Sequence, residues 1–133
     1  MVLLEKDIYI GSALVGLYAK CGEFSKARNL LDYLPLRNMV SWTSLISGYT
    51  QLGMAKDALI CYEEMQCEGI TPDAFTYVCA LKACGFSGNV EKGETIHGSI
   101  VCHRFLHKNV IIGTALVDMY TRFGALEKAQ EVF

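Results

Sequence analysis

Apolar residues along the chain fall into paired stripes with the three- and four-residue spacing of helices rather than the alternation of strands. A glycine follows the first stripe of each pair, as expected where a left-handed residue ends a helix. Pro35 and Pro72 follow the second stripe of the first two pairs. The first stripes contain Leu14, Val15 and Tyr18; Trp42, Leu45, Ile46 and Tyr49; Tyr77, Leu81 and Cys84; and Thr114, Leu116, Val117 and Tyr120. The pattern predicts a series of two-helix hairpins, each turning at its glycine.

These hairpins repeat along the chain. The stretch SALVGLYAKCGEFSKA at residues 12–27 returns as TALVDMYTRFGALEKA at residues 114–129. The turn glycines are 31, 35 and 36 residues apart, at Gly22, Gly53, Gly88 and Gly124. Periods of this length are typical of stacked supersecondary units.

Small residues stand five positions after each turn glycine, at Ala27, Ala58, Gly93 and Ala129. We expect the second helix of each hairpin to cross the first there, and this closeness would explain Gly93, which costs about 1 kcal/mol of helix propensity relative to alanine. Helices of about a dozen residues are marginal alone, so each hairpin must bury its apolar face on the next. The expected fold class is all-α, a right-handed α-solenoid of stacked antiparallel helix hairpins.

Composition agrees with a packed helical protein. The chain has 133 residues, about one domain, with 52% hydrophobic and 20% charged residues. No apolar run is long enough to cross a membrane, and Glu5, Lys6 and Asp7 interrupt the only apolar N-terminal run, so we expect neither a membrane partner nor a secretory signal. The helical pattern runs to Phe133 without a stop signal, so we expect a fragment of a longer protein.

Neither the cysteines nor the histidines predict a metal site. The six cysteines form no CxxC pair, and we expect reduced thiols that are mostly buried. His103 and His107 lie four residues apart, but no further ligand has zinc spacing. We therefore expect no metal and no cofactor.

The repeat steps, with the stretches LVGLYAKCG, SWTSLISGYTQLG, GITPD and FTYVCALKACG, resemble the pentatricopeptide repeat proteins of plants. More narrowly, they resemble the subclass that alternates short, standard and long repeats. On this resemblance residues 1–7 are the tail of a preceding repeat, 8–38 a short repeat, 39–73 a standard repeat, 74–109 a long repeat and 110–133 a truncated short repeat.

The resemblance implies sequence-specific binding of single-stranded RNA, one base per repeat, in mitochondria or chloroplasts. It further implies a role in guiding RNA editing or processing, with editing or processing factors as further partners. The fifth and last residues of each repeat read the base: Ser12 with Asn38, Thr43 with Asp73, Val78 with Asn109, and Thr114 in the truncated repeat. The second residues sandwich the bases and are Tyr9, Val40, Phe75 and Ile111.

Side-chain chemistry makes this pairing sensible. An ionised Asp only accepts hydrogen bonds and suits guanine or uracil, which present a ring N–H, whereas an Asn amide suits adenine or cytosine. The family pattern adds that a small hydroxyl at the fifth position favours purines. With the protein N-terminus at the RNA 5′ end, these rules predict 5′-A-G-N-purine-3′, in which the base at Val78 is open.

Each of these residues also has an ordinary structural interpretation. Hydroxyls in first helical turns, as expected for Ser12, Thr43 and Thr114, commonly satisfy backbone N–H groups, and Asn38 and Asp73 at turns suit helix capping. The bulky second residues would be core on periodicity alone. Only recurrence in the same repeat slots, together with the resemblance, favours RNA contact.

Charge predicts modest attraction to phosphates. The formal net charge is −2, with +2 in residues 8–38, −4 in residues 39–73 and +2 in residues 74–109. We expect the acidic repeat to place Glu63 and Glu64 on its second helix, away from the base-reading positions. So few repeats should bind RNA weakly.

Two further comparisons bound the function. A protein-interaction solenoid of the tetratricopeptide type is the alternative, but it expects uniform steps of about 34 residues, and the steps here are unequal. No nucleophile motif or phosphate loop occurs, and the H-x-E and P-C-x-x-C elements of zinc deaminases are absent from the sequence. We therefore expect no enzymatic activity from this chain.

Overall fold

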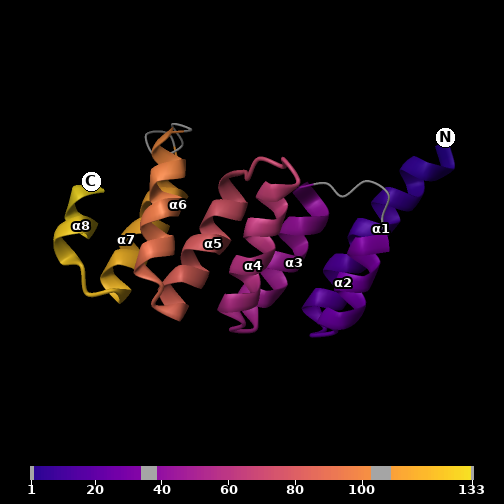
Figure 1. Cartoon of the computed structure of the whole chain (residues 1–133), viewed down its shortest axis with the longest axis horizontal. Helices are drawn as coiled ribbons and strands as arrows, with labels where there is room; N and C mark the ends of the chain where they lie inside the picture. The colour runs from indigo at the N-terminus through magenta and orange to yellow at the C-terminus, as the bar shows by residue number, and fades with distance from the viewer. Residues whose placement is uncertain (1, 34–38, 103–108, 133) are drawn as a thin grey trace. The chain divides into compact units, whose positions relative to one another are not determined.

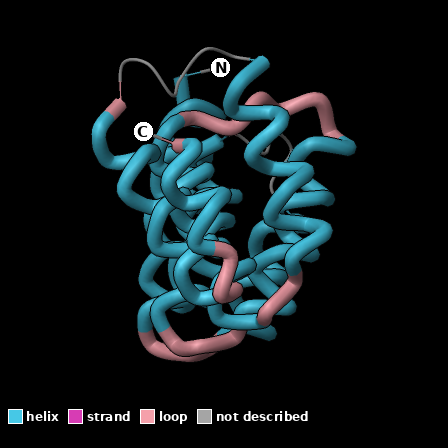
Figure 2. Tube along the Cα trace, turned by 90° about the vertical axis from the view of Figure 1, so that its left-hand side faces the viewer, coloured by secondary structure: helices cyan, strands magenta, loops and turns pink. Residues whose placement is uncertain are grey.

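The computed structural model describes residues 2–33, 39–102 and 109–132, with side chains from Ile10 onward, and within these ranges it contains helices but no strand (Figures 1 and 2). The helices are α1 (Val2–Lys20), α2 (Phe24–Tyr33), α3 (Met39–Gln51), α4 (Ala55–Cys67), α5 (Ala74–Ser87), α6 (Val90–Cys102), α7 (Val110–Arg122) and α8 (Leu126–Glu131). The expected all-α class is therefore confirmed. The helices divide between two compact units, residues 1–71 and 72–133.

The four turn glycines end the first helix of each hairpin as the sequence predicts. Their φ angles are 79° at Gly22, 77° at Gly53, 70° at Gly88 and 75° at Gly124, values that side chains with a Cβ rarely adopt. After each glycine, the next backbone N–H donates to the carbonyl five residues back, at Tyr18, Tyr49, Cys84 and Tyr120, over 2.8–3.2 Å. This bond is the mark of the Schellman helix end. The repeated residue four positions before the glycine thus supplies the carbonyl that closes each turn.

In the first unit, α1 packs on α2 and α3, and α3 packs on α4. The core contains Val15, Leu31, Trp42, Leu45, Ile46 and Met65, each at most 1% exposed. The rings of Phe24 and Tyr49 stack with centroids 4.0 Å apart, which joins the start of α2 to α3. Leu14, placed in the core stripe from the sequence, is 36% exposed, because α1 has only α2 and α3 as packing partners among the described helices of this unit.

In the second unit, α5 packs on α6 and α7, and α7 packs on α8. Its core contains Tyr77, Leu81, Ile96, Ile100, Ile112, Leu116 and Met119, each at most 2% exposed. The helices α3, α5 and α7 begin at Met39, Ala74 and Val110, the residues at which the second, third and fourth repeats are predicted to start. In contrast, α1 begins at Val2, before the predicted start of the first repeat at residue 8. The repeat boundaries drawn from the sequence stay a prediction.

One of the small residues that follow the turn glycines contacts the next hairpin. Ala27, Ala58, Gly93 and Ala129 are all buried as predicted. At Gly93, however, a Cβ atom would lie 2.8 Å from the Met119 sulfur and 3.0 Å from Phe123, which belong to the next hairpin. Gly93 therefore makes room for the neighbouring hairpin, and the expected crossing within its own hairpin stays a prediction.

Consecutive first helices approach each other most closely through a second set of small residues. A Cβ atom added to Gly48 of α3 would lie 2.5 Å from the Ala19 Cβ of α1 and 3.2 Å from the Ala19 backbone. In the other unit, a Cβ atom on Gly85 of α5 would lie 3.7 Å from the Met119 Cα of α7. Ala19 and Gly85 both stand three residues before their turn glycine, and Gly48 and Met119 both stand five before theirs. Within each unit, adjacent hairpins therefore meet in the same register.

All six cysteines are free thiols, as expected. Cys61, Cys79 and Cys84 are buried, but Cys21, Cys67 and Cys102 are exposed. The expectation that most would be buried is therefore correct for half of them. Exposed thiols at helix ends follow from the short helices, whose last turns project beyond the packed core.

Candidate nucleic-acid interface

Of the fifth residues expected to read bases, three lie near the beginnings of α3, α5 and α7, whereas Ser12 lies in the middle of α1. Ser12, Thr43 and Val78 are 5%, 9% and 9% exposed, whereas Thr114 is exposed. Each residue stands ten positions before its turn glycine, so the four share one helical register. The side chains at three of these positions therefore lie against the packed helices with only an edge accessible.

The expected base-sandwiching residues lie on the surface. Val40, Phe75 and Ile111 are 59%, 54% and 68% exposed, so their interpretation as core residues, which periodicity alone favours, is wrong. Residues three apart share one face of a helix, so each of these side chains neighbours the fifth residue of its own repeat. The side chain of Tyr9 lies outside the described residues.

The last residues of two repeats cap the helix that follows. Asp73 Oδ1 accepts hydrogen bonds from the backbone N–H of Thr76 at 2.9 Å and from its hydroxyl at 2.7 Å. Asn109 Oδ1 accepts from the N–H groups of Ile111 at 3.0 Å and Ile112 at 3.2 Å. The capping interpretation is therefore correct for Asp73, and Asn109 plays the same part. Asn38 lies outside the described residues, as do His103 and His107.

Each cap uses one terminal atom of the side chain, Oδ1, and leaves the other terminal atom without a hydrogen bond in the part of the chain that the structure describes. Both bonds at Asp73 end on Oδ1, and among the described residues Oδ2 has no hydrogen-bond partner. Both bonds at Asn109 also end on Oδ1, so within the same ranges Nδ2 has none. Asp73 thus presents a fixed acceptor and Asn109 a fixed donor, because the cap holds each side chain in one orientation.

The hydroxyls of Ser12 and Thr114 differ from their expected capping role. The Thr114 hydroxyl donates to the carbonyl of Val110 at 2.8 Å, a bond to a carbonyl in place of the expected bond to a backbone N–H. Ser12 lies inside α1, well past the first turn, because that helix begins at Val2. Among the described residues, Ser12 Oγ is the one buried side-chain oxygen or nitrogen without a hydrogen-bond partner.

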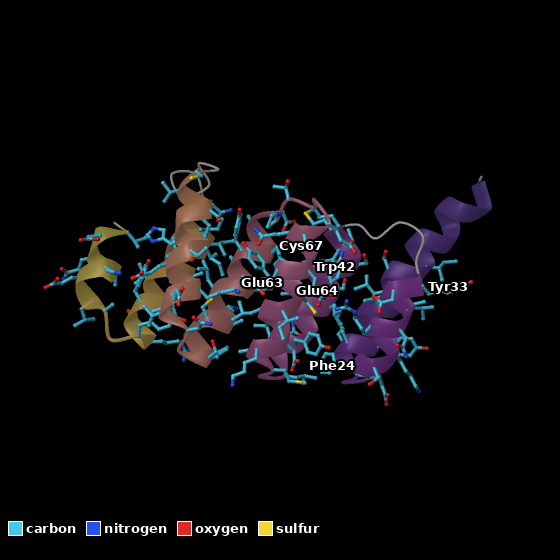
Figure 3. The ribbon with its side chains drawn as sticks, viewed as in Figure 1. Phe24, Tyr33, Trp42, Glu63, Glu64 and Cys67 are labelled. Atoms are coloured by element: carbon cyan, nitrogen blue, oxygen red, sulfur yellow. The ribbon has the colours of Figure 1, made fainter. Side chains whose placement is uncertain are left out.

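The two acidic side chains that the sequence assigned to the second helix of residues 39–73 lie there, as expected. Glu63 and Glu64 belong to α4 and are labelled in Figure 3. Glu64 binds Arg28 of α2, and Glu68, at the C-terminal end of α4, accepts from the indole N–H of Trp42. Ion pairing therefore neutralises part of the acidic charge of this repeat. Sequence reasoning missed these contacts because 36 and 26 residues separate the partners, and no local pattern links them.

Comparison with known proteins identifies the repeats. A model described as the PPR repeat matches residues 12–39, and one described as the PPR repeat family matches residues 37–85. A chloroplastic pentatricopeptide repeat-containing protein of Arabidopsis thaliana, At4g18520, is 47% identical over 130 residues, which are 98% of this chain and 21% of the relative. The mitochondrial protein At3g24000 of the same plant is 39% identical, over 98% of this chain and 20% of the relative.

The chain belongs to the pentatricopeptide repeat family. It spans about a fifth of the length of these curated relatives. The crystal structure of the pentatricopeptide repeat protein PPR10 from maize is similar to this chain with a TM-score of 0.71 at 20% identity, covering 94% of this chain and 18% of that one. This similarity shows the fold, an α-solenoid of stacked hairpins. Relatives named chloroplastic or mitochondrial support the expected organellar location of this pentatricopeptide repeat protein.

Two observations concern membranes and metal ions. None of the helices in the described part of the pentatricopeptide repeat chain has the length and apolar character needed to cross a membrane. Within residues 2–33, 39–102 and 109–132, no three metal-ligating side chains come together.

Proposed function

We propose that this pentatricopeptide repeat protein binds single-stranded RNA and reads one base with each repeat. The observation that carries the proposal is the arrangement of the Asp73 and Asn109 side chains. The Oδ1 atom of each caps a helix, while Asp73 Oδ2 and Asn109 Nδ2 have no hydrogen-bond partner among the described residues. A cap by itself requires only Oδ1. The family resemblance assigns the same two positions to base reading.

The atom that each cap spares selects a different class of base. Oδ2 of Asp73 accepts a hydrogen bond and matches the ring N–H of guanine or uracil. Nδ2 of Asn109 donates and matches the ring nitrogen acceptor of adenine or cytosine. In the proposed pairing, Thr43 with Asp73 reads guanine and Ser12 with Asn38 reads adenine. Val78 offers no polar group beside Asn109, and Thr114 favours a purine, so the proposed target is 5′-A-G-N-purine-3′.

Exposed second residues supply contact that does not depend on base identity. Val40, Phe75 and Ile111 project from the surface beside the reading positions. Stacking on an aromatic side chain is worth about 1–3 kcal/mol per base, and Phe75 is the aromatic member of this set. Bases held between such side chains would present their edges to the fifth and last residues, as the resemblance implies for Tyr9 as well.

The wider biological role is also proposed. The unequal repeat steps support the subclass with short, standard and long repeats, and that subclass guides editing or processing of organellar transcripts together with further protein factors. Because the net charge is −2, phosphate attraction is modest, and this chain should bind RNA weakly at physiological salt.

Replacement of Asp73 by Asn tests the reading role without removing the cap. Asn is as good an N-cap as Asp, so the melting curve should not change. The spared atom changes from an acceptor to a donor. Binding of fluorescently labelled RNAs that differ only at the second base should then shift from guanine towards adenine by about tenfold, the discrimination of one good hydrogen-bonded pair.

Two further variants complete the test, which is read by fluorescence anisotropy at low salt. Thr43→Asn beside the native Asp73 should move the preference from guanine towards uracil. Thr114→Ala should leave the second-base preference unchanged and serves as the matched control. An unaltered guanine preference in Asp73→Asn, or equal binding of all RNAs by the native chain, would contradict the proposed function.

A further inference from the structure

Arg28 of α2 stands at the centre of a polar cluster that joins three helices. Its Nη1 donates to Glu64 Oε1 of α4 at 2.9 Å, and its Nη2 donates to Glu64 Oε2. Its Nε donates to Asp32 Oδ1 at 3.3 Å, and its guanidinium lies 5.3 Å from the centroid of the Trp42 ring of α3. The two-pronged bond to Glu64 fixes the plane of the guanidinium, which is therefore directed over the indole.

Trp42 is held at its edge as well as at its face. The indole N–H donates to Glu68 Oε1 at 3.1 Å, and the residue is 1% exposed. Trp42 of α3 and Glu64 of α4 are both labelled in Figure 3. A ring fixed on its face by Arg28 and on its edge by Glu68 has one orientation, which leaves α3 little freedom to rotate about its own axis.

Rotation of α3 would move the proposed base-reading group. Thr43 follows Trp42 directly, about 100° further around the helix, and Val40 precedes it by two residues. With side chains about 5–6 Å from the helix axis, a rotation of about 20° moves their tips by roughly 2 Å. Hydrogen bonds tolerate only a few tenths of an ångström around 2.9 Å. A change in the orientation of Trp42 that rotates α3 would therefore displace Thr43 by more than a hydrogen bond tolerates.

Within this chain, the cluster is a feature of one repeat, because the other repeats lack the tryptophan and the arginine at the corresponding positions. The position of Trp42, eleven residues before the turn glycine, is Gly11 in the first repeat and Gly113 in the fourth, and a buried Tyr77 in the third. The position of Arg28, six residues after the turn glycine, is Leu59 in the second repeat and Glu94 in the third. Loss of the cluster should therefore affect the second base alone.

We propose that Arg28 is a positioning residue for base reading by the second repeat, acting through Glu64 and Trp42 from outside the RNA-contacting positions. This inference rests on the proposed function. The side chains of Arg28 and Glu64 are 31% and 39% exposed, and ion pairs of such exposure contribute little to stability. Removing the pair should therefore leave the protein folded while releasing the face of the indole that Arg28 covers.

Charge reversal with rescue tests the proposal. In Arg28→Glu, discrimination between guanine and cytosine at the second base should fall by at least threefold, while discrimination at the first base stays as in the native chain. The double variant Arg28→Glu with Glu64→Arg restores the pair and should recover most of the loss. Arg28→Lys keeps the charge without the planar fork and should lie between the two.

Lys128→Glu is the matched control, because it changes the net charge equally and breaks an ion pair with Glu94 elsewhere in the chain. It should weaken binding of every RNA to the same extent and leave both ratios intact. A second-base ratio that is unaltered in Arg28→Glu, or ratios that fall together at both bases, would overturn the inference.

A direct readout separates failure of this inference from failure of the proposed function. Trp42 is the single tryptophan, so acrylamide quenching of its fluorescence reports how the indole is held. Arg28→Glu should increase quenching severalfold at unchanged helical circular dichroism, and the double variant should reverse it. If quenching does not change, Arg28 does not hold the ring, and the inference is wrong whatever the RNA-binding measurements show. If quenching changes but the native chain shows no base preference, the proposed function fails and the reading role of Arg28 falls with it.

Discussion

Gly48→Ala is the sharpest test of how consecutive hairpins pack. Gly48 lies in α3, and a Cβ atom there would be 2.5 Å from the Ala19 Cβ and 3.2 Å from the Ala19 carbonyl carbon and oxygen. Real Cβ atoms essentially never approach to 2.5 Å, and the obstructing atoms belong to backbone or to a methyl group fixed to it. The two helices must therefore move apart, because no side chain can rotate away.

The expected effect combines two opposing contributions. Alanine in a helix is more favourable than glycine by about 0.8–1 kcal/mol. Overpacking of a well-packed contact costs typically about 1–3 kcal/mol, and the upper part of that range applies because backbone must shift. The free energy of unfolding should therefore fall by about 1–2 kcal/mol, which lowers the melting temperature by about 4–8 °C in a chain of this size.

The assay uses the position of the single tryptophan. Trp42 lies in the same helix as Gly48, so urea unfolding followed by its fluorescence reports the first unit directly. Circular dichroism at 222 nm reports both units. Gly16→Ala is the matched control, because a Cβ at Gly16 would lie 3.4 Å from Ser44 Oγ in the same α1–α3 contact, an ordinary van der Waals distance. It should raise stability by about 0.5–1 kcal/mol.

Exchange of the two residues closes the test. Ala19→Gly alone should destabilise, because a buried methyl group and helix propensity are lost, but it removes the obstacle that Gly48→Ala meets. The double variant Ala19→Gly with Gly48→Ala should therefore be more stable than the sum of the single changes by at least 1 kcal/mol. If Gly48→Ala is as stable as the native chain, or if the two effects simply add, α1 and α3 do not pack in this register.

Three other expectations follow from the same structure. His97 Nδ1 lies 2.7 Å from the Tyr120 hydroxyl, and burial lowers the pKa of His97. The stability that the neutral imidazole contributes is therefore present above about pH 6.5 and is lost on acidification. His97→Asn should flatten this loss in urea titrations at pH 5 to 7, and an equally steep loss in the variant would contradict the expectation. Burial raises the pKa of the Cys61 and Cys84 thiols from 9.0 to about 12. The stability that the neutral thiols contribute is therefore present below about pH 9 and falls as the pH rises towards 12. Cys84→Ala should reduce the fall in the free energy of unfolding over this range, and an unaltered fall would show that the Cys84 thiol is exposed to water. Asp73→Ala should cost about 1 kcal/mol through loss of the N-cap while Asp73→Asn costs almost none, and equal melting temperatures would show that the cap does not stabilise α5.

Local geometry could be predicted from the sequence because single residues decide it. A glycine at the end of an apolar stripe selects the left-handed conformation, so the ends of the first helices at Gly22, Gly53, Gly88 and Gly124 followed from the chain alone. The same holds for the cap at Asp73, whose carboxylate bonds three residues along its own helix. Repeat spacing then indicated hairpins that stack.

The sequence predicted which equivalent repeat positions form the candidate site, but not the exposure or hydrogen bonds of their side chains. The sequence placed Val40, Phe75 and Ile111 in one repeat position, but periodicity assigned them to the core, and their exposure depends on which neighbours cover a helix face. It also placed Asp73 and Asn109 in one position without showing that the cap uses one oxygen and spares the second terminal atom. That division is a matter of side-chain orientation, which spacing does not encode.

The sequence by itself determined the helical class, the ends of the first helices at their turn glycines and the period of the repeat, because these depend on backbone conformation and on residues within one turn of each other. Only the tertiary structure decided the contacts between hairpins. Gly48 is required by Ala19, Gly93 by Met119 and Phe123, and Arg28 is oriented by Glu64, although the partners are 26 to 36 residues apart. Such pairs meet because helices of similar length pack in a fixed register, and the register is set by the fit of whole helix surfaces.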